Sequence, residues 1–151
     1  DANALDDYEE GTFTPGITGS TGTPSGVNFG NRLGKYTKIG RMVYIQITMN
    51  ASSTTTQGSG AIRLTGLPFP SSTSDGWTSG AKYYALGVPN IELMQTSRVG
   101  GGLYMLNLTG ADEIRVYRDN GSTGGMAELT WASDIDGDFS FRLNFCYPTD
   151  S

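Results

Sequence analysis

The sequence contains no histidine in its 151 residues. Histidine is the usual general base near neutral pH and the commonest metal ligand in proteins. It also activates the nucleophile in the widespread Ser-His and Cys-His pairs. Its absence therefore argues against the large classes of hydrolases and metalloenzymes that depend on an imidazole.

Cysteine is almost as scarce, because Cys146 is the single example in the chain. One cysteine cannot form an intrachain disulfide, so the fold must be held by other interactions. Cys146 lies in the apolar run Phe145-Cys146-Tyr147. We therefore expect it to be a small residue of the hydrophobic core.

Charged residues make up only 17% of the chain, with 10 Lys and Arg against 15 Asp and Glu. The basic residues are scattered rather than clustered, so nucleic acid is not an expected partner. No apolar run is long enough to span a bilayer, and no charged-then-apolar leader is present, so membrane insertion is not expected. Because the sequence begins at Asp1 without a methionine, we expect it to be processed or part of a longer protein.

Glycine is abundant, with 22 residues, and serine and threonine are frequent. Such a composition favours short strands joined by turns over helices, and no convincing helix is predicted. The clearest strand runs from Arg41 to Met49, where apolar residues alternate with more polar ones. Gly40 can supply a bend that lets Tyr36 to Ile39 pair back against this strand.

Further strands are predicted along the rest of the chain. Loops are expected at 16–34, interrupted by Val27 and Phe29 at strand spacing, and at 51–60 and 71–80. A turn is expected at Asn120-Gly121. The total is roughly eight or nine strands, which predicts an all-β fold, an antiparallel β-sandwich that is jelly-roll-like. Residues 1–11 are expected to be an acidic arm or a connector to a missing upstream shaft, and residues 12–151 a single domain. The further strands are expected at Thr12–Pro15, Ala61–Thr65, Lys82–Val88, Leu103–Leu108, Glu113–Tyr117, Met126–Trp131 and Phe139–Tyr147.

Four segments of the chain resemble, in the same order, a module at the C-terminal end of bacteriophage tail fibre and tailspike proteins. They are Leu5–Pro15, Gly34–Arg41, Gly66–Phe69 and Ala132–Ile135. The resemblance implies a β-sandwich tip that forms a homotrimer, is attached to a longer shaft and recognises the host cell surface. It implies an extracellular location on the phage tail of the virion. It brings no catalytic residues and no cofactor.

Aromatic residues beside short polar ones are the best candidates for glycan binding. Sugars place C–H groups on aromatic faces and need polar partners for their hydroxyls. Trp77 with Asp75 is the clearest instance, followed by Tyr83 and Tyr84, of which only one can be displayed because neighbours on a strand face opposite ways. Alternatively, Trp77 caps the end of the sandwich or packs against a neighbouring chain.

The segment Asp134-Ile135-Asp136-Gly137-Asp138 spaces its carboxylates like the start of an EF-hand calcium loop. The bidentate glutamate at the twelfth position of such a loop is missing, since Phe145 stands there. We therefore interpret the segment as a plain turn and predict no metal site.

A glycosidase needs two carboxylates across a cleft. Several could be paired on paper, but sequence alone cannot place any two at the required separation, so catalysis is disfavoured. The first hypothesis is thus a host-attachment domain that binds surface glycan, the second a structural trimerisation cap without a ligand, and the third a polysaccharide-cleaving enzyme. The carboxylates considered are Asp75, Glu92, Asp112, Glu113 and Glu128.

Overall fold

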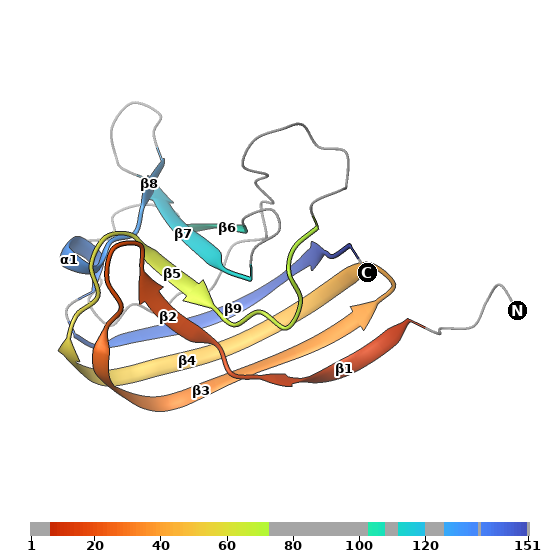
Figure 1. Cartoon of the computed structure of the whole chain (residues 1–151), viewed down its shortest axis with the longest axis horizontal. Helices are drawn as coiled ribbons and strands as arrows, with labels where there is room; N and C mark the ends of the chain where they lie inside the picture. The colour runs from red at the N-terminus through yellow and green to blue at the C-terminus, as the bar shows by residue number, and fades with distance from the viewer. Residues whose placement is uncertain (1–6, 73–102, 108–111, 120–125, 136, 151) are drawn as a thin grey trace, which may run out of the picture.

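The computed structural model describes residues 7–72, 103–107, 112–119, 126–135 and 137–150. Two antiparallel sheets face each other (Figure 1). Sheet A has the strand order β1-β3-β4-β9. Sheet B has the order β2-β5-β7-β6, and β8 pairs with β7. The predicted all-β, antiparallel sandwich is confirmed.

Except for β2, each described strand overlaps a predicted one, and one short helix interrupts them. The helix α1 spans Trp131–Asp134, so the expectation of no helix was wrong at these four residues. The strands are β1 (Tyr8–Phe13), β2 (Gly16–Gly19), β3 (Ser25–Ile39), β4 (Met42–Thr56), β5 (Ile62–Thr65), β6 (Leu103–Asn107), β7 (Ile114–Asp119), β8 (Met126–Glu128) and β9 (Phe139–Pro148).

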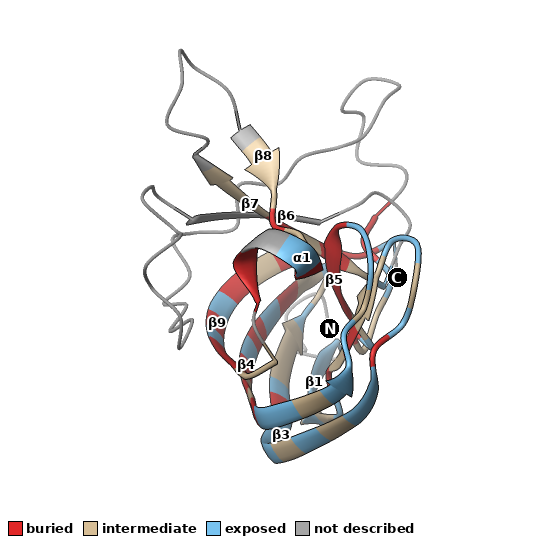
Figure 2. Ribbon diagram, turned by 90° about the vertical axis from the view of Figure 1, so that its left-hand side faces the viewer, coloured by how far each residue is buried: buried red, intermediate tan, exposed pale blue. Residues whose placement is uncertain are grey.

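The core lies between the two sheets and is built from alternate residues of the strands. Buried and exposed segments alternate along β4 and β9 (Figure 2), as the period-two patterns predict. Sheet B contributes its own apolar residues from β5 and β7. The core residues of these four strands are Val43, Ile45, Ile47, Met49, Ala51, Ile62, Leu64, Ile114, Val116, Phe139, Phe141, Leu143, Phe145 and Tyr147.

The hairpin between β3 and β4 turns at Gly40 and Arg41, because Ile39 pairs with Met42. Gly40 has a φ of 56°, in the left-handed region that side chains avoid. A glycine at the first of two central residues is what a type II′ hairpin requires, and its twist matches that of the strands. The bend predicted at Gly40 is therefore confirmed.

Both strands of this hairpin are longer than predicted. The segments 16–34 and 51–60 were expected to be loops, but β2 and most of β3 occupy the first, and β4 continues to Thr56 in the second. Pairing extends to Ser25 opposite Thr56, with irregularities around Phe29. Val27 and Phe29 pack against the core and anchor this polar end. Threonine is common in strands because it is β-branched, so a polar segment rich in threonine can extend β4 although its polarity suggested a loop.

Two aromatic rings of sheet A lie over two glycines of the neighbouring strand. Phe13 is paired with Gly34, and Tyr36 with Gly11. A Cβ atom at Gly34 would lie 2.3 Å from Cζ of Phe13, and one at Gly11 would lie 2.8 Å from the Tyr36 ring. Both glycines are therefore needed for the rings to lie flat on the sheet. This pairing also brings residues 8–11 into sheet A, so β1 begins at Tyr8 rather than at Thr12.

One expected feature is wrong, and two others lie outside the described residues. Cys146 is half-buried and stands opposite Tyr44, on the face of β9 that points away from the core, so it is not a core residue. The strand expected at Lys82–Val88 and the turn at Asn120-Gly121 lie outside the described residues. In the part of the chain that the structure describes, no helix is long and apolar enough to cross a membrane.

Substituting Gly34 by alanine is expected to destabilise the domain by about 1–3 kcal/mol, because the new methyl group overpacks against the Phe13 ring. The matched control is Gly30→Ala on the same strand. There the nearest atom, at 2.8 Å, is the end of the Asn50 side chain, which can rotate away. Urea unfolding of both variants measures the difference, and equal midpoints would refute the ring-over-glycine explanation.

Tyr147 is fully buried, and its hydroxyl donates a hydrogen bond of 2.8 Å to the carbonyl of Phe69. Burial raises the pKa of Tyr147 above the usual 10.0, so folding favours the neutral phenol. The stabilisation that the neutral, buried Tyr147 provides is fully present below the pKa of the unfolded state, near 10.0. It is lost as the pH rises from there toward the higher pKa of the folded state.

Tyr147→Phe is therefore expected to cost about 1 kcal/mol near neutral pH, because the Phe69 carbonyl loses its donor. The variant should also lose less stability than the wild type between neutral pH and pH values above 10. Thermal melts across that range test this, with Tyr44→Phe as the exposed control. An unchanged alkaline slope in Tyr147→Phe would contradict the account.

Candidate site on the outer face of sheet A

The outer face of sheet A consists of the residues on β1, β3, β4 and β9 that alternate with the core residues. Strand register arranges these residues in rows across the sheet. One row contains Glu10, Thr37, Tyr44 and Cys146. The next row contains Thr12, Lys35, Gln46 and Asn144.

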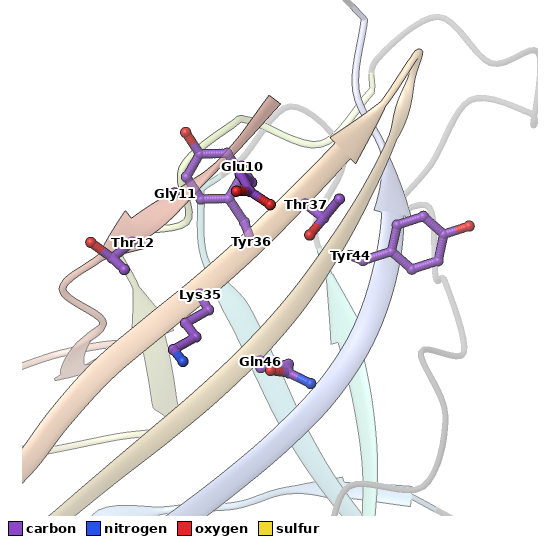
Figure 3. Close-up of a pocket in the computed structure, with 8 residues that line it drawn as sticks. All are labelled: Glu10, Gly11, Thr12, Lys35, Tyr36, Thr37, Tyr44 and Gln46. Carbon is purple, nitrogen blue, oxygen red and sulfur yellow. The ribbon is translucent and has the colours of Figure 1, made fainter. Parts of the chain in front are cut away.

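A groove of about 480 Å³ lies on this face and spans β1, β3 and β4. The side chains that line it come from all three strands (Figure 3). Tyr44 stands on the β9 side of the groove, and Thr12 and Glu10 stand on the β1 side. The complete lining is Glu10, Gly11, Thr12, Lys35, Tyr36, Thr37, Tyr44 and Gln46.

Two tyrosine hydroxyls donate hydrogen bonds to the carboxylates of Glu9 and Glu10, near the start of β1. Tyr8 donates to Glu10 at 2.7 Å, and Tyr36 donates to Glu9 at 2.6 Å. In both tyrosines the hydrogen bond to the carboxylate is the main cause that raises the pKa above its usual value. Lys35, by contrast, makes no ion pair or hydrogen bond within the described part of the chain.

The groove thus combines a displayed aromatic ring with an amide, an ammonium group and hydroxyls. Tyr44 is 50% exposed, and Gln46 and Lys35 are also exposed. An apolar ring face beside several hydrogen-bonding groups suits a ligand with C–H patches and hydroxyls, such as a sugar. The ring of Tyr44 and the polar groups of Gln46 and Lys35 stand on paired strands rather than on loops, so their positions are preorganised.

Exposed apolar side chains also collect on the outer face of sheet A. All four large hydrophobic residues that are exposed in the described part of the chain lie there: Tyr8, Leu33, Ile39 and Tyr44. Tyr8 and Ile39 are paired, and Ile39 is paired in turn with the half-buried Met42. This apolar row at one end of the sheet adjoins the groove.

Charged residues on sheet B form an ion-pair network instead of an open site. The Arg63 side chain is only 8% exposed, and it lies 3.2 Å from Glu128 and 3.8 Å from Glu113. Arg115 lies 3.3 Å from the same Glu128 oxygen, to which Tyr117 donates at 3.0 Å. Burial is the main cause that raises the pKa of Tyr117. The network therefore ties β5, β7 and β8 together.

Two of the carboxylates considered for catalysis, Glu113 and Glu128, belong to this network. Asp112 is exposed. Asp75 and Glu92 lie outside the described residues, so their separation from the others is not defined.

Asp134, the first carboxylate of the calcium-like segment, is engaged within the protein. It is 4% exposed, accepts a hydrogen bond of 2.8 Å from the Thr130 amide at the start of α1, and lies 3.1 Å from Nε of Arg118. Asp136 lies outside the described residues. No group of three or more potential metal ligands occurs among the residues that the structure describes.

The predicted glycan residues Trp77, Asp75, Tyr83 and Tyr84 all lie outside the described residues, so their roles stay predictions. The groove was missed by the sequence analysis. The sequence does indicate part of the groove, because Tyr44 and Gln46 alternate with core residues along the long strand and so face outward. Their neighbours Lys35 and Glu10 come from other strands, and only the register places them alongside.

No family model matches the chain, and no curated protein sequence matches it. Among solved structures, the crystal structure of the Dettilon tailspike protein is similar to this domain. The likeness has a TM-score of 0.58 at 22% sequence identity and covers 93% of this chain. The chain spans 24% of the tailspike chain. The domain therefore shares its β-sandwich fold with one portion of a phage tailspike protein.

Proposed function

We propose that this chain is the host-attachment domain of a phage tail fibre or tailspike, located on the virion tail, and that it binds a cell-surface glycan. The observation that carries the proposal is the fold shared with a tailspike over 93% of the chain. The open groove at Tyr44 supports a binding role, because it offers a ring face and hydrogen-bonding groups together. The partners are the host glycan and the upstream shaft of the same protein.

The domain acts as a homotrimer in this proposal and has no enzymatic activity. Three copies on one axis would present three equal sites, so that weak affinity for each sugar becomes useful avidity on a cell surface.

A second candidate is a structural trimerisation cap that binds no ligand. The apolar row of Tyr8, Ile39 and Met42 favours this alternative, since a row of this kind can be covered by a neighbouring chain.

The two candidates differ in a binding experiment with an array of lipopolysaccharide O-chains and bacterial capsular polysaccharides. A host-attachment domain is expected to bind at least one polysaccharide and to have the native mass of a trimer by light scattering. A trimer that binds no member of the array would favour the cap, and a monomer at all concentrations would contradict both.

An assay for reducing ends on each bound polysaccharide tests for cleavage. Release of new reducing ends by the purified domain would overturn the non-enzymatic proposal. We expect no new reducing ends, because the resemblance to tail fibre and tailspike modules implies that any polysaccharide cleavage belongs to another domain.

A further inference from the structure

We propose that the groove on the outer face of sheet A binds an acidic saccharide, with a sugar ring stacked on Tyr44 and its anionic group paired with Lys35. This inference rests on the proposed glycan-binding function and adds the site and the chemical class of the ligand.

Tyr44 is suited to be the stacking platform. It stands on β4, an inner strand of sheet A, between Thr37 on β3 and Cys146 on β9. Half of its surface is exposed, and its hydroxyl has no hydrogen-bond partner within the described part of the chain. A ring that is held by paired strands loses little entropy on binding, so the stacking energy is retained. The free hydroxyl can also bond to a sugar substituent.

Lys35 supplies a positive charge on the same face of the sheet as Tyr44. It is paired with Gln46, two residues along β4 from Tyr44, so Lys35 and Tyr44 are diagonal neighbours on one face. Diagonal neighbours in a sheet are roughly 7–8 Å apart, and a lysine side chain spans part of that separation. Gln46 lies beside both residues, with an amide that can donate to and accept from hydroxyls.

The groove lining carries one positive and one negative side chain, Lys35 and Glu10, and of the two only Lys35 is paired with Gln46. Glu10, the acidic residue of the lining, already accepts the hydrogen bond of Tyr8. Lys35 has no counter-ion among the described residues, although the chain as a whole has a net charge of -5. A neutral sugar would leave this ammonium without a charged partner. A carboxylate or phosphate on the sugar would form a charge-assisted hydrogen bond with it, which is about twice as strong as a neutral one.

The test uses the whole chain and any polysaccharide that it binds on the array. Each bound polysaccharide is presented again after chemical reduction of its uronic acid carboxyls to neutral alcohols, and separately after removal of its phosphate groups. We expect one of these treatments to weaken binding about tenfold, and the treatment that does so identifies the anionic group. Unchanged binding after both treatments would overturn the inferred ligand class.

The site is tested with matched variants. Tyr44→Ala and Lys35→Gln are each expected to weaken binding about tenfold, whereas Tyr44→Phe retains the ring and most of the affinity. The control for charge is Lys38→Gln, because Lys38 lies on the same strand but on the opposite face, with Nζ 5.8 Å from the Phe69 ring. Light scattering and thermal melts establish that every variant is folded, as expected for the exposed Tyr44 and Lys35.

The outcomes separate this inference from the proposed function. Loss of binding in Tyr44→Ala and Lys35→Gln, but not in Lys38→Gln, supports the groove. Binding that survives both variants overturns the groove while the host-attachment function stands, and its loss in Trp77→Ala would then favour the site predicted from the sequence. An array with no bound polysaccharide overturns the proposed function itself, and the inference with it.

Discussion

The antiparallel pairing of β3 with β4 is the interaction on which the rest of the domain depends. Both strands are 15 residues long, and they pair from Ile39 opposite Met42 to Ser25 opposite Thr56. Within the part of the chain that the structure describes, β1 pairs only with β3 and β9 only with β4, so each outer strand needs this hairpin as its template. A turn at Gly40 that matches the strand twist sets the register, and a shift of one residue would reverse every side chain.

Register has direct consequences on both faces of sheet A. On the inner face it brings the rings of Phe13 and Tyr36 onto Gly34 and Gly11, which lets bulky side chains pack where two strands run close together. On the outer face it aligns Tyr44 with Thr37 and Gln46 with Lys35, and so builds the groove. The same pairing therefore supports the core and assembles the candidate binding surface.

The two sheets use their polar residues differently. On sheet B the carboxylates of Glu113 and Glu128 form ion pairs with arginines, of which Arg63 is almost fully buried, and the network joins β5 to β7 and β8. On sheet A the ammonium of Lys35 and the amide of Gln46 are exposed beside an aromatic ring. Groups that already form ion pairs have little hydrogen-bonding capacity left for a ligand, whereas unpaired groups on a rigid strand are available, so the outer face of sheet A is the candidate binding surface.

The sequence by itself determined the fold class, the strands with strict alternation such as β4 and β9, and the bend at Gly40. In these segments the local sequence pattern and the tertiary fold agree, because strict alternation of apolar and polar residues indicates a strand with one buried face. Only the tertiary structure decided that the polar residues 52–56 extend a strand, that Cys146 faces away from the core, and that Lys35 lies near Tyr44. Those features depend on pairing between segments distant in sequence, and no local pattern encodes which strand becomes the neighbour of which.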